Sequence, residues 1–271
     1  MGKREDMSMS QTRDEVIRYR LNKMTKWAAQ RREFLANLPE DWPKDRYIRI
    51  GGNGFTAVSL NHDRPLLGFD SGTVKSIETV KGHFSKSIEG KPGKPTPERH
   101  VQCWLIKQAI NHQLDLKGEL CPDDSEYDEL LFALDEVSFG DKKHPQIMRC
   151  DILAVGVHHG NNFPVLIELK SSHYLDRPHG LLGQLQDYQD GMKKFKPQIE
   201  TLLKNCVNKK VDFSKCGKII IWPRLSSGKV SNKTFDKCKE ESVGIIQYTW
   251  NHNANIENIK FETYPGLKLA P

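Results

Sequence analysis

The sequence predicts an α/β fold in which a mixed β-sheet is flanked by helices, and three observations lead to this prediction. First, short apolar runs typical of buried strands occur at 149–157, 163–170, 218–222 and 243–250. Second, an apolar stripe of helical period marks 180–195; its members are Leu181, Leu185, Tyr188, Met192 and Phe195. Third, helices and strands interleave from residue 96 onward in the order α-β-β-β-α-β-α-β, which implies helices packed on one sheet.

The first 90 residues predict a helix followed by a β-hairpin. Apolar residues recur at helical spacing over 11–37, and Pro39 ends the segment. Strands are expected at 47–50 and 55–60, joined by a Gly-Gly-Asn-Gly turn. A segment rich in Pro, Gly and Lys follows at 86–97 and reads as a loop or linker. We therefore expect an N-terminal region at 1–90, which binds substrate or a partner, and a main domain at 91–271.

The main domain is expected to begin with a helix from residue 96 to about 114. Strands are then predicted at 130–139, 149–157 and 163–170, followed by the helix at 180–195. A short helix at 231–240 lies between the last two apolar runs.

Composition excludes several classes of protein. No run approaches the roughly 20 apolar residues that span a bilayer, and the N-terminus lacks the apolar run of a secretory signal. A cytoplasmic protein is expected. None of the six cysteines forms a C-x-x-C pair, which disfavours a zinc finger or an iron–sulfur cluster. No His-Glu-x-x-His pairing occurs either, so the histidines do not predict a metal site.

The net charge of +6 permits a polyanionic partner without requiring one. Lysines concentrate between residues 189 and 218, beginning with Lys193, Lys194 and Lys196. Two interpretations stay open: a solvated helix face with a loop, or a surface that follows a phosphate backbone. Trp222 has two interpretations as well, a residue at the edge of the core or a platform for a base, and the former is preferred.

The candidate catalytic side chains lie in the segments around Asp151 and Glu168. A polar turn, His158 to Asn162, separates the two apolar runs, and a hairpin centred at 159–160 pairs Asp151 with Glu168. Their Cβ atoms are then expected about 5 Å apart. Lys170 and Arg149 lie two residues from Glu168 and Asp151, so they project from the same face.

Two buried carboxylates this close repel each other unless a cation lies between them or one is protonated. Mg²⁺ prefers oxygen ligands and keeps water in its other positions. Such a water can attack a phosphate, while Lys170 orients the water or neutralises the developing charge. The alternative is a cross-strand salt bridge without catalytic meaning. The apolar character of both runs favours the metal site.

These motifs resemble the PD-(D/E)XK nuclease superfamily over about residues 96–250. The resemblance implies a restriction-endonuclease-like fold in which Glu98, on the helix before the three strands, reaches the metal site. Capping of its own helix is the competing role for Glu98. Gln184 and Tyr188 match the Gln-x-x-x-Tyr motif of exonuclease-like branches. Cys150 stands where the family carries a variable proline, which ligates nothing.

The sequence therefore predicts a metal-dependent nuclease that acts on nucleic acid, DNA in preference to RNA. Mg²⁺ is the expected cofactor, with Mn²⁺ as a substitute, and Asp151, Glu168 and Glu98 are its expected ligands. Lys170, Gln184 and Tyr188 complete the catalytic set, and Arg149, Lys193, Lys194 and Lys196 are expected to hold the substrate. A homodimer is left open, as is a catalytically silent module that binds nucleic acid or a protein on the same fold.

Overall fold

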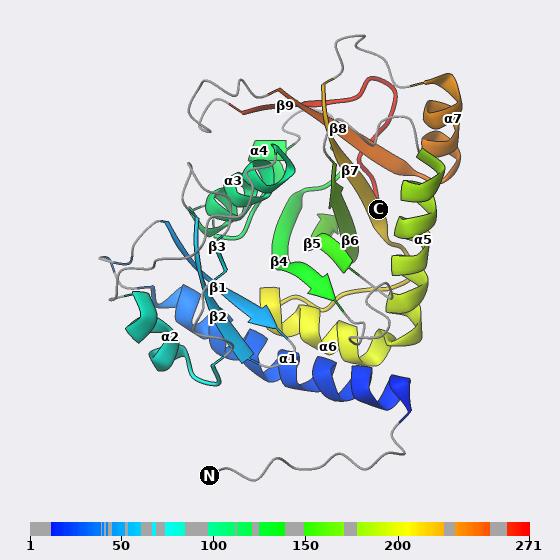
Figure 1. The fold of residues 1–271 in the computed structure, drawn as a ribbon. Coiled ribbons are helices and arrows are strands. Elements are labelled where there is room, and N and C mark those ends of the chain that lie inside the picture. Colours follow the sequence, from blue (N-terminus) through cyan, green and yellow to red (C-terminus); the bar gives the residue numbers. More distant parts are fainter. Residues whose placement is uncertain are drawn as a thin grey trace.

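A computed structural model describes most of the chain (Figure 1). The described residues are 12–38, 40, 42, 45–51, 54–60, 67–68, 74–84, 97–111, 113–120, 125–138, 149–170, 178–224, 231–249 and 259–271. The predicted linker at 86–97 and the predicted domain boundary near residue 90 lie almost entirely outside this set. None of the described helices is both long and apolar enough to cross a membrane.

The main sheet has six strands in the order β4-β5-β6-β7-β8-β9. An antiparallel meander is formed by β4 (Glu129–Ser138), β5 (Arg149–His158) and β6 (Asn161–Leu169). Parallel pairing continues from β6 to β7 (Gly217–Pro223) and from β7 to β8 (Val243–Thr249), and β9 (Lys260–Thr263) closes the edge in the antiparallel sense. The predicted α/β class with a mixed sheet is confirmed.

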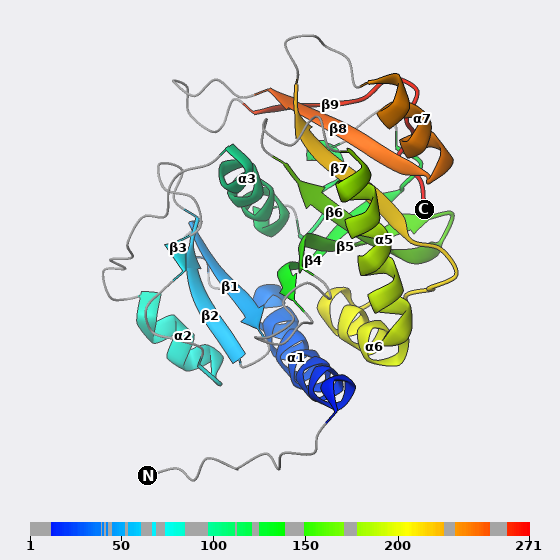
Figure 2. The same cartoon turned by 45° about the vertical axis from the view of Figure 1, so that its right-hand side comes forward.

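Helices cover both faces of this sheet (Figure 2). One face carries α3 (Pro97–Asn111), and the other carries α5 (Pro178–Lys194) and α6 (Lys196–Val207). The short helices α4 (Lys117–Leu120) and α7 (Asn232–Glu240) lie beside the sheet. The strand–helix–strand connection from β6 to β7 runs through α5 and α6, because parallel neighbours need a crossover.

Alternation along the strands divides the buried side chains into two cores. Ile152 and Ile167 belong to the core on the α3 side, together with Val101 and Leu105. Leu153 and Leu166, one residue along, belong to the core on the α5 side, which also contains Leu185. Residues next to Ile152 and Ile167 therefore project toward α5.

The N-terminal region packs onto the main sheet rather than standing apart. It contains α1 (Arg13–Ala36), the hairpin β1 (Arg46–Gly51) and β2 (Gly54–Ser59), the short strand β3 (Leu67–Gly68), and α2 (Ile77–Phe84). Leu21 of α1 shares the α5-side core, and Tyr47 of β1 shares the α3-side core. The predicted helix and hairpin are confirmed, whereas β3 and α2 were not predicted.

Buried charges join this region to β4. Arg31, which is 1% exposed, donates from Nη1 to the Tyr47 hydroxyl over 2.7 Å and from Nη2 to the Ala133 carbonyl. The Tyr47 hydroxyl donates to Asp135 Oδ1 over 2.8 Å, and Arg49 Nε donates to Asp135 Oδ2 over 2.6 Å. The register between β4 and β5 skips Ala133, so the Arg31 contact satisfies the carbonyl of a β-bulge residue.

One predicted helix boundary is wrong, and two elements were not predicted. The helix expected to reach residue 114 ends at Asn111, because Gln113 and Leu114 have φ values of 54° and 76°, which no helix accommodates. The lysine-rich stretch contains the separate helix α6, whose buried stripe the charge run obscured. The four-residue strand β9 was missed because its half-exposed pattern is too short to register.

Candidate functional site

The hairpin β5–β6 positions the two predicted carboxylates. His159 and Gly160 form its two-residue turn with φ values of 48° and 75°, the pair of positive angles that a tight hairpin turn requires. Pairing runs from His158↔Asn161 to Ile152↔Ile167, which confirms the predicted register. One step further, Asp151 stands opposite Glu168. Asp151 reaches across the strands, and its Oδ2 accepts a hydrogen bond from the Leu169 N–H over 2.8 Å.

Glu168 is the centre of a buried polar cluster. Only 2% of the residue is exposed, and its Oε1 accepts hydrogen bonds from Lys170 Nζ and, over 3.0 Å, from Gln184 Nε2. Its other oxygen, Oε2, is buried and has no hydrogen-bond partner among the described residues. Lys170 and Gln184 were both predicted for the site, and the structure brings both to Glu168.

Helix α5 supplies two side chains from one of its faces. Gln184 and Tyr188 lie one turn apart, and Gln184 Nε2 also donates to the Tyr188 hydroxyl. Tyr188 is buried within the α5-side core. The predicted core stripe of α5 is confirmed, and Tyr188 belongs to it while also touching Gln184. Tyr188 is therefore a core residue that also contacts Gln184.

Burial dominates the electrostatics of the pair. Burial, together with repulsion from Glu168, raises the pKa of Asp151 well above its usual range, although the Leu169 N–H and Lys170 oppose this shift. Burial also raises the pKa of Glu168 against the opposing charge of Lys170. Burial works against a charged Lys170, yet the hydrogen bond to Glu168 and the combined attraction of Glu168, Asp151 and Glu98 raise the pKa of that ammonium. Buried Glu168 and partly buried Asp151 thus share one cationic side chain.

No protein-family model matches this chain, and no curated protein matches its sequence. What the site can do is therefore inferred from its own side chains.

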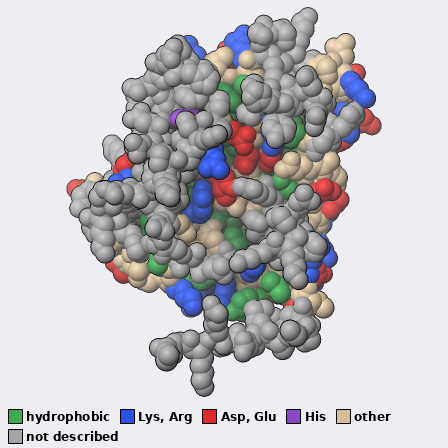
Figure 3. Space-filling view, in the orientation of Figure 1, with side chains coloured by type: hydrophobic (Ala, Val, Ile, Leu, Met, Phe, Trp, Pro, Cys, Tyr) green, Lys and Arg blue, Asp and Glu red, His purple; other side chains and the backbone are tan. Residues whose placement is uncertain are grey.

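Helix α3 brings a third acid toward the pair. The charge of Glu98 contributes to the raised pKa values of Asp151, Glu168 and Lys170. On the same helix, buried Gln102 donates from Nε2 to the Asp151 carbonyl over 3.2 Å and to Glu136 Oε1 over 3.3 Å. In the space-filling view, acidic side chains gather near the centre of one face with Lys or Arg side chains beside them (Figure 3).

Two residues of this neighbourhood were not predicted as site residues. Tyr248 donates from its hydroxyl to the Lys170 carbonyl over 3.3 Å, and burial followed by the charge of Glu98 raises its pKa. Glu136 has a φ of 48°, which interrupts the regular strand where β4 passes Asp151. Neither residue belongs to a sequence motif. Both are brought to the site by strands that are distant in sequence from Asp151 and Glu168.

The predicted substrate lysines are not brought to the carboxylates. Lys193 and Lys194 end α5, about 15 Å along the helix from Gln184. They form exposed ion pairs with Asp190 at 3.5 Å and Asp14 at 2.9 Å. Lys196 starts α6 with Nζ 5.9 Å from the centroid of the Phe213 ring. For Arg149, only the backbone in β5 is described, paired with Ser138.

The histidines and cysteines near this hairpin add no metal ligand to the carboxylate pair as the structure describes them. His158 and His159 stack at the hairpin turn, at the opposite end of β5 from Asp151, with ring centroids 4.0 Å apart. Within the described residues, no group of three His, Cys, Asp or Glu side chains is close enough to hold a metal ion. Buried Cys150 donates from Sγ to the Ile152 carbonyl over 2.9 Å, and burial raises its thiol pKa well above the usual value.

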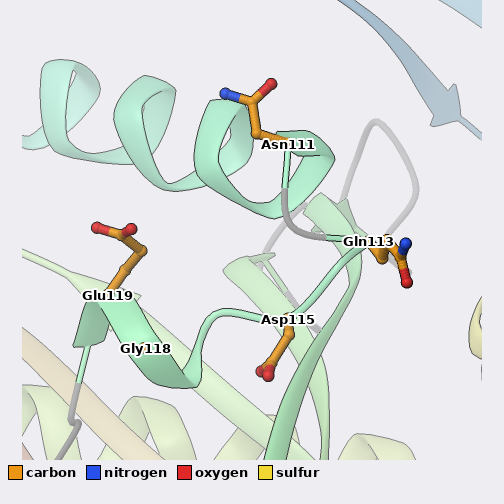
Figure 4. A pocket seen from close by; sticks show the side chains of 5 residues that line it. All are labelled: Asn111, Gln113, Asp115, Gly118 and Glu119. Carbon is orange, nitrogen blue, oxygen red and sulfur yellow. The ribbon is translucent and has the colours of Figure 1, made fainter.

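A separate polar hollow lies beyond the C-terminal end of α3 (Figure 4). It is lined by Asn111, Gln113, Asp115, Gly118 and Glu119. Asp115 Oδ1 accepts hydrogen bonds from the Lys117 and Leu130 N–H groups over 2.9 and 3.1 Å, so this carboxylate holds the start of α4 against β4. Thirteen residues of chain, about 20 Å of helix, separate Asn111 from Glu98. The hollow is not part of the carboxylate site.

Proposed function

We propose that this chain is a metal-dependent nuclease that hydrolyses phosphodiester bonds, in DNA in preference to RNA. One observation carries the proposal: partly buried Asp151 and buried Glu168 stand opposite each other at one end of adjacent strands, and Glu168 Oε2 lacks a hydrogen-bond partner among the described residues. A buried carboxylate oxygen without a donor is costly, and such groups often face an ion or water. A cation is the partner that satisfies this oxygen and offsets the repulsion.

The chemistry of the available donors fits Mg²⁺, with Mn²⁺ as a substitute. Asp151 and Glu168 offer carboxylate oxygens, which hard divalent cations prefer. Cys150 is protonated and donates its hydrogen to a carbonyl, so it offers no thiolate for zinc. Glu98 is a third acid whose charge acts on the pair, but the three carboxylates do not lie close enough together to hold one ion, so Asp151 and Glu168 are the proposed ligands.

When bound, the cation supplies Lewis acidity toward the phosphate and an activated water. The remaining roles belong to the chain. Lys170, at the end of β6, carries the positive charge that faces a negatively charged phosphate oxygen or orients the water. Gln184 holds Glu168 Oε1, Tyr188 positions Gln184, and the Leu169 N–H fixes Asp151. These contacts preorganise the carboxylates.

The order of elements around the site gives further support. A helix, an antiparallel three-stranded meander, a helical crossover and a parallel strand follow each other as α3, β4–β5–β6, α5 and β7. This is the order that resemblance to the PD-(D/E)XK superfamily implies, so we include a restriction-endonuclease-like fold in the proposal. The fold-level likeness is an analogy, and the argument for function depends on the site.

The test is cleavage by the purified full chain with Mg²⁺ or Mn²⁺, on single- and double-stranded DNA and on RNA. The proposal predicts cutting that Asp151→Asn and Lys170→Met each reduce at least a hundredfold. Glu129→Gln is the matched control, because Glu129 lies at the far end of β4 in an exposed pair with Lys209. Absence of cutting on every substrate, or full activity in Asp151→Asn, contradicts the proposal.

One observation favours a catalytically silent binding module instead. Lys170 and Gln184 together satisfy Glu168 Oε1 without a metal ion. Calorimetry with Mg²⁺ separates the two functions: the nuclease predicts binding that Asp151→Asn removes, whereas the silent module predicts binding of nucleic acid without any Mg²⁺ binding that depends on Asp151.

A further inference from the structure

Trp222, near the end of β7, has a buried polar atom with no assigned role. The residue is 2% exposed, and its indole Nε1 has no hydrogen-bond partner in the part of the chain that the structure describes. An indole N–H can only donate. Buried donors without an acceptor are rare in folded proteins, and each one requires an explanation such as a ligand, an ion or an ordered water.

Strand register locates this indole beside the proposed site. Parallel pairing aligns Glu168 with Ile220 and Leu169 with Ile221, and the Lys170 N–H donates to the Ile221 carbonyl over 3.0 Å. The next step of the register brings Trp222 next to Lys170, on a strand about 4.8 Å away. Ile220 and Trp222 both lie in the α5-side core, so Trp222 shares the sheet face of Glu168 and Lys170.

Three groups on this face complement one another in hydrogen bonding and charge. Among the described residues, Glu168 Oε2 lacks a donor and Trp222 Nε1 lacks an acceptor, and Lys170, two residues beyond Glu168 along the chain, is opposite Trp222 when the register is continued. The non-bridging oxygens of a phosphodiester accept hydrogen bonds and carry negative charge. They therefore match an indole N–H next to an ammonium, whereas a carboxylate oxygen matches a cation bound to the same phosphate.

We propose that the indole N–H of Trp222 donates a hydrogen bond to a non-bridging phosphate oxygen of the nucleic-acid substrate. This inference rests on the proposed nuclease function and names a substrate-binding residue for it. Trp222 is then a phosphate ligand and not a stacking platform. Its ring is packed in the core, and its N–H lacks a hydrogen-bond acceptor among the described residues.

The direct test follows indole N–H signals by ¹H–¹⁵N NMR in the full-length Asp151→Asn protein, in which cutting is expected to be suppressed, with a short DNA duplex. The Trp222 signal is identified by its loss in an added Trp222→Phe substitution. We expect it to move downfield when the duplex binds. Trp104 on α3 is the internal control, because its Nε1 is also buried without a partner among the described residues but lies in the α3-side core.

Kinetics provides the second measurement. Trp222→Phe keeps the ring and removes the N–H, and we expect kcat/KM for DNA to fall at least about tenfold, the loss typical of a hydrogen bond to a charged acceptor. Trp104→Phe is expected to leave it unchanged. If the wild-type chain cuts DNA while Trp222→Phe cuts equally well, or the Trp222 signal stays in place when DNA binds, the inference is overturned and the nuclease function stands. If the wild-type chain cuts nothing, the proposed function itself fails.

Discussion

Gln184 on α5 donates a hydrogen bond from Nε2 to Glu168 Oε1 across 3.0 Å. This bond ties the crossover helix to the end of β6 and leaves Oε2 as the oxygen of Glu168 without a partner among the described residues. The orientation of the carboxylate is therefore set by α5 and not by its strand alone.

Removing this bond is expected to weaken metal binding more than folding. Gln184→Ala leaves Glu168 held by Lys170 alone, and loss of a partner that orients a metal ligand typically costs about 10- to 100-fold in affinity. Gln186→Ala is the matched control on the same helix, since Gln186 bonds to Asp190 and Lys218 away from Glu168. Calorimetry with Mg²⁺ measures both variants, and equal affinities would contradict the assigned role of Gln184.

The raised pKa values of the carboxyl pair predict how stability depends on pH without metal. Burial raises both values above those of the unfolded chain, so the folded chain binds more protons than the unfolded chain. The free energy of unfolding should therefore fall as pH rises from about 4, the ordinary carboxyl pKa, up through the raised values. Saturating Mg²⁺ should flatten this dependence. Urea unfolding at a series of pH values is the measurement.

Asp151→Asn is expected to stabilise the metal-free chain at neutral pH by about 1–3 kcal/mol, because it removes a partly buried acid that is repelled by buried Glu168. The amide oxygen of asparagine can still accept from the Leu169 N–H. The same variant should gain nothing from Mg²⁺. A loss of stability in Asp151→Asn would show that the carboxylate is well satisfied as it stands, and would argue against a missing cation.

The buried hydrogen bonds of Arg31 predict that contacts between the N-terminal region and β4 contribute strongly to the free energy of unfolding. Arg31→Met removes the donor to the Ala133 carbonyl and to the Tyr47 hydroxyl, and a buried acceptor left unsatisfied typically costs about 1–3 kcal/mol. Arg32→Met, one residue along, should cost less than about 1 kcal/mol, because Arg32 bonds near the surface to the Lys204 and Asn205 carbonyls. Denaturant unfolding compares the two, and similar losses would contradict the assigned role of Arg31.

The sequence was sufficient for the hairpin and its register. A polar turn between two apolar strands determines which residues pair, so Asp151 and Glu168 could be predicted as neighbours. Helical periodicity likewise predicted the buried stripe of α5. These features depend on local spacing, which a single sequence displays.

Contacts between distant segments could not be predicted in the same way. Helical spacing predicts which face of α5 is buried but not where the helix lies along the strands. The hydrogen bond between Gln184 and Glu168 could therefore not be predicted from the sequence. The contact of Tyr248 with Lys170 depends on the order of β6, β7 and β8. The position of Lys193 and Lys194 relative to the carboxylates could not be predicted for a related reason, because charge in sequence does not say which end of a helix faces the site.

The central claim is that Asp151 and Glu168 together hold a divalent cation, and a crystal structure with Mn²⁺ tests it most directly. The account predicts an anomalous scattering peak bonded to both carboxylates, with Glu168 Oε2 among its ligands. Crystals soaked in Mn²⁺ that show no peak there, and in which Lys170 remains the only cationic group on Glu168, would contradict it.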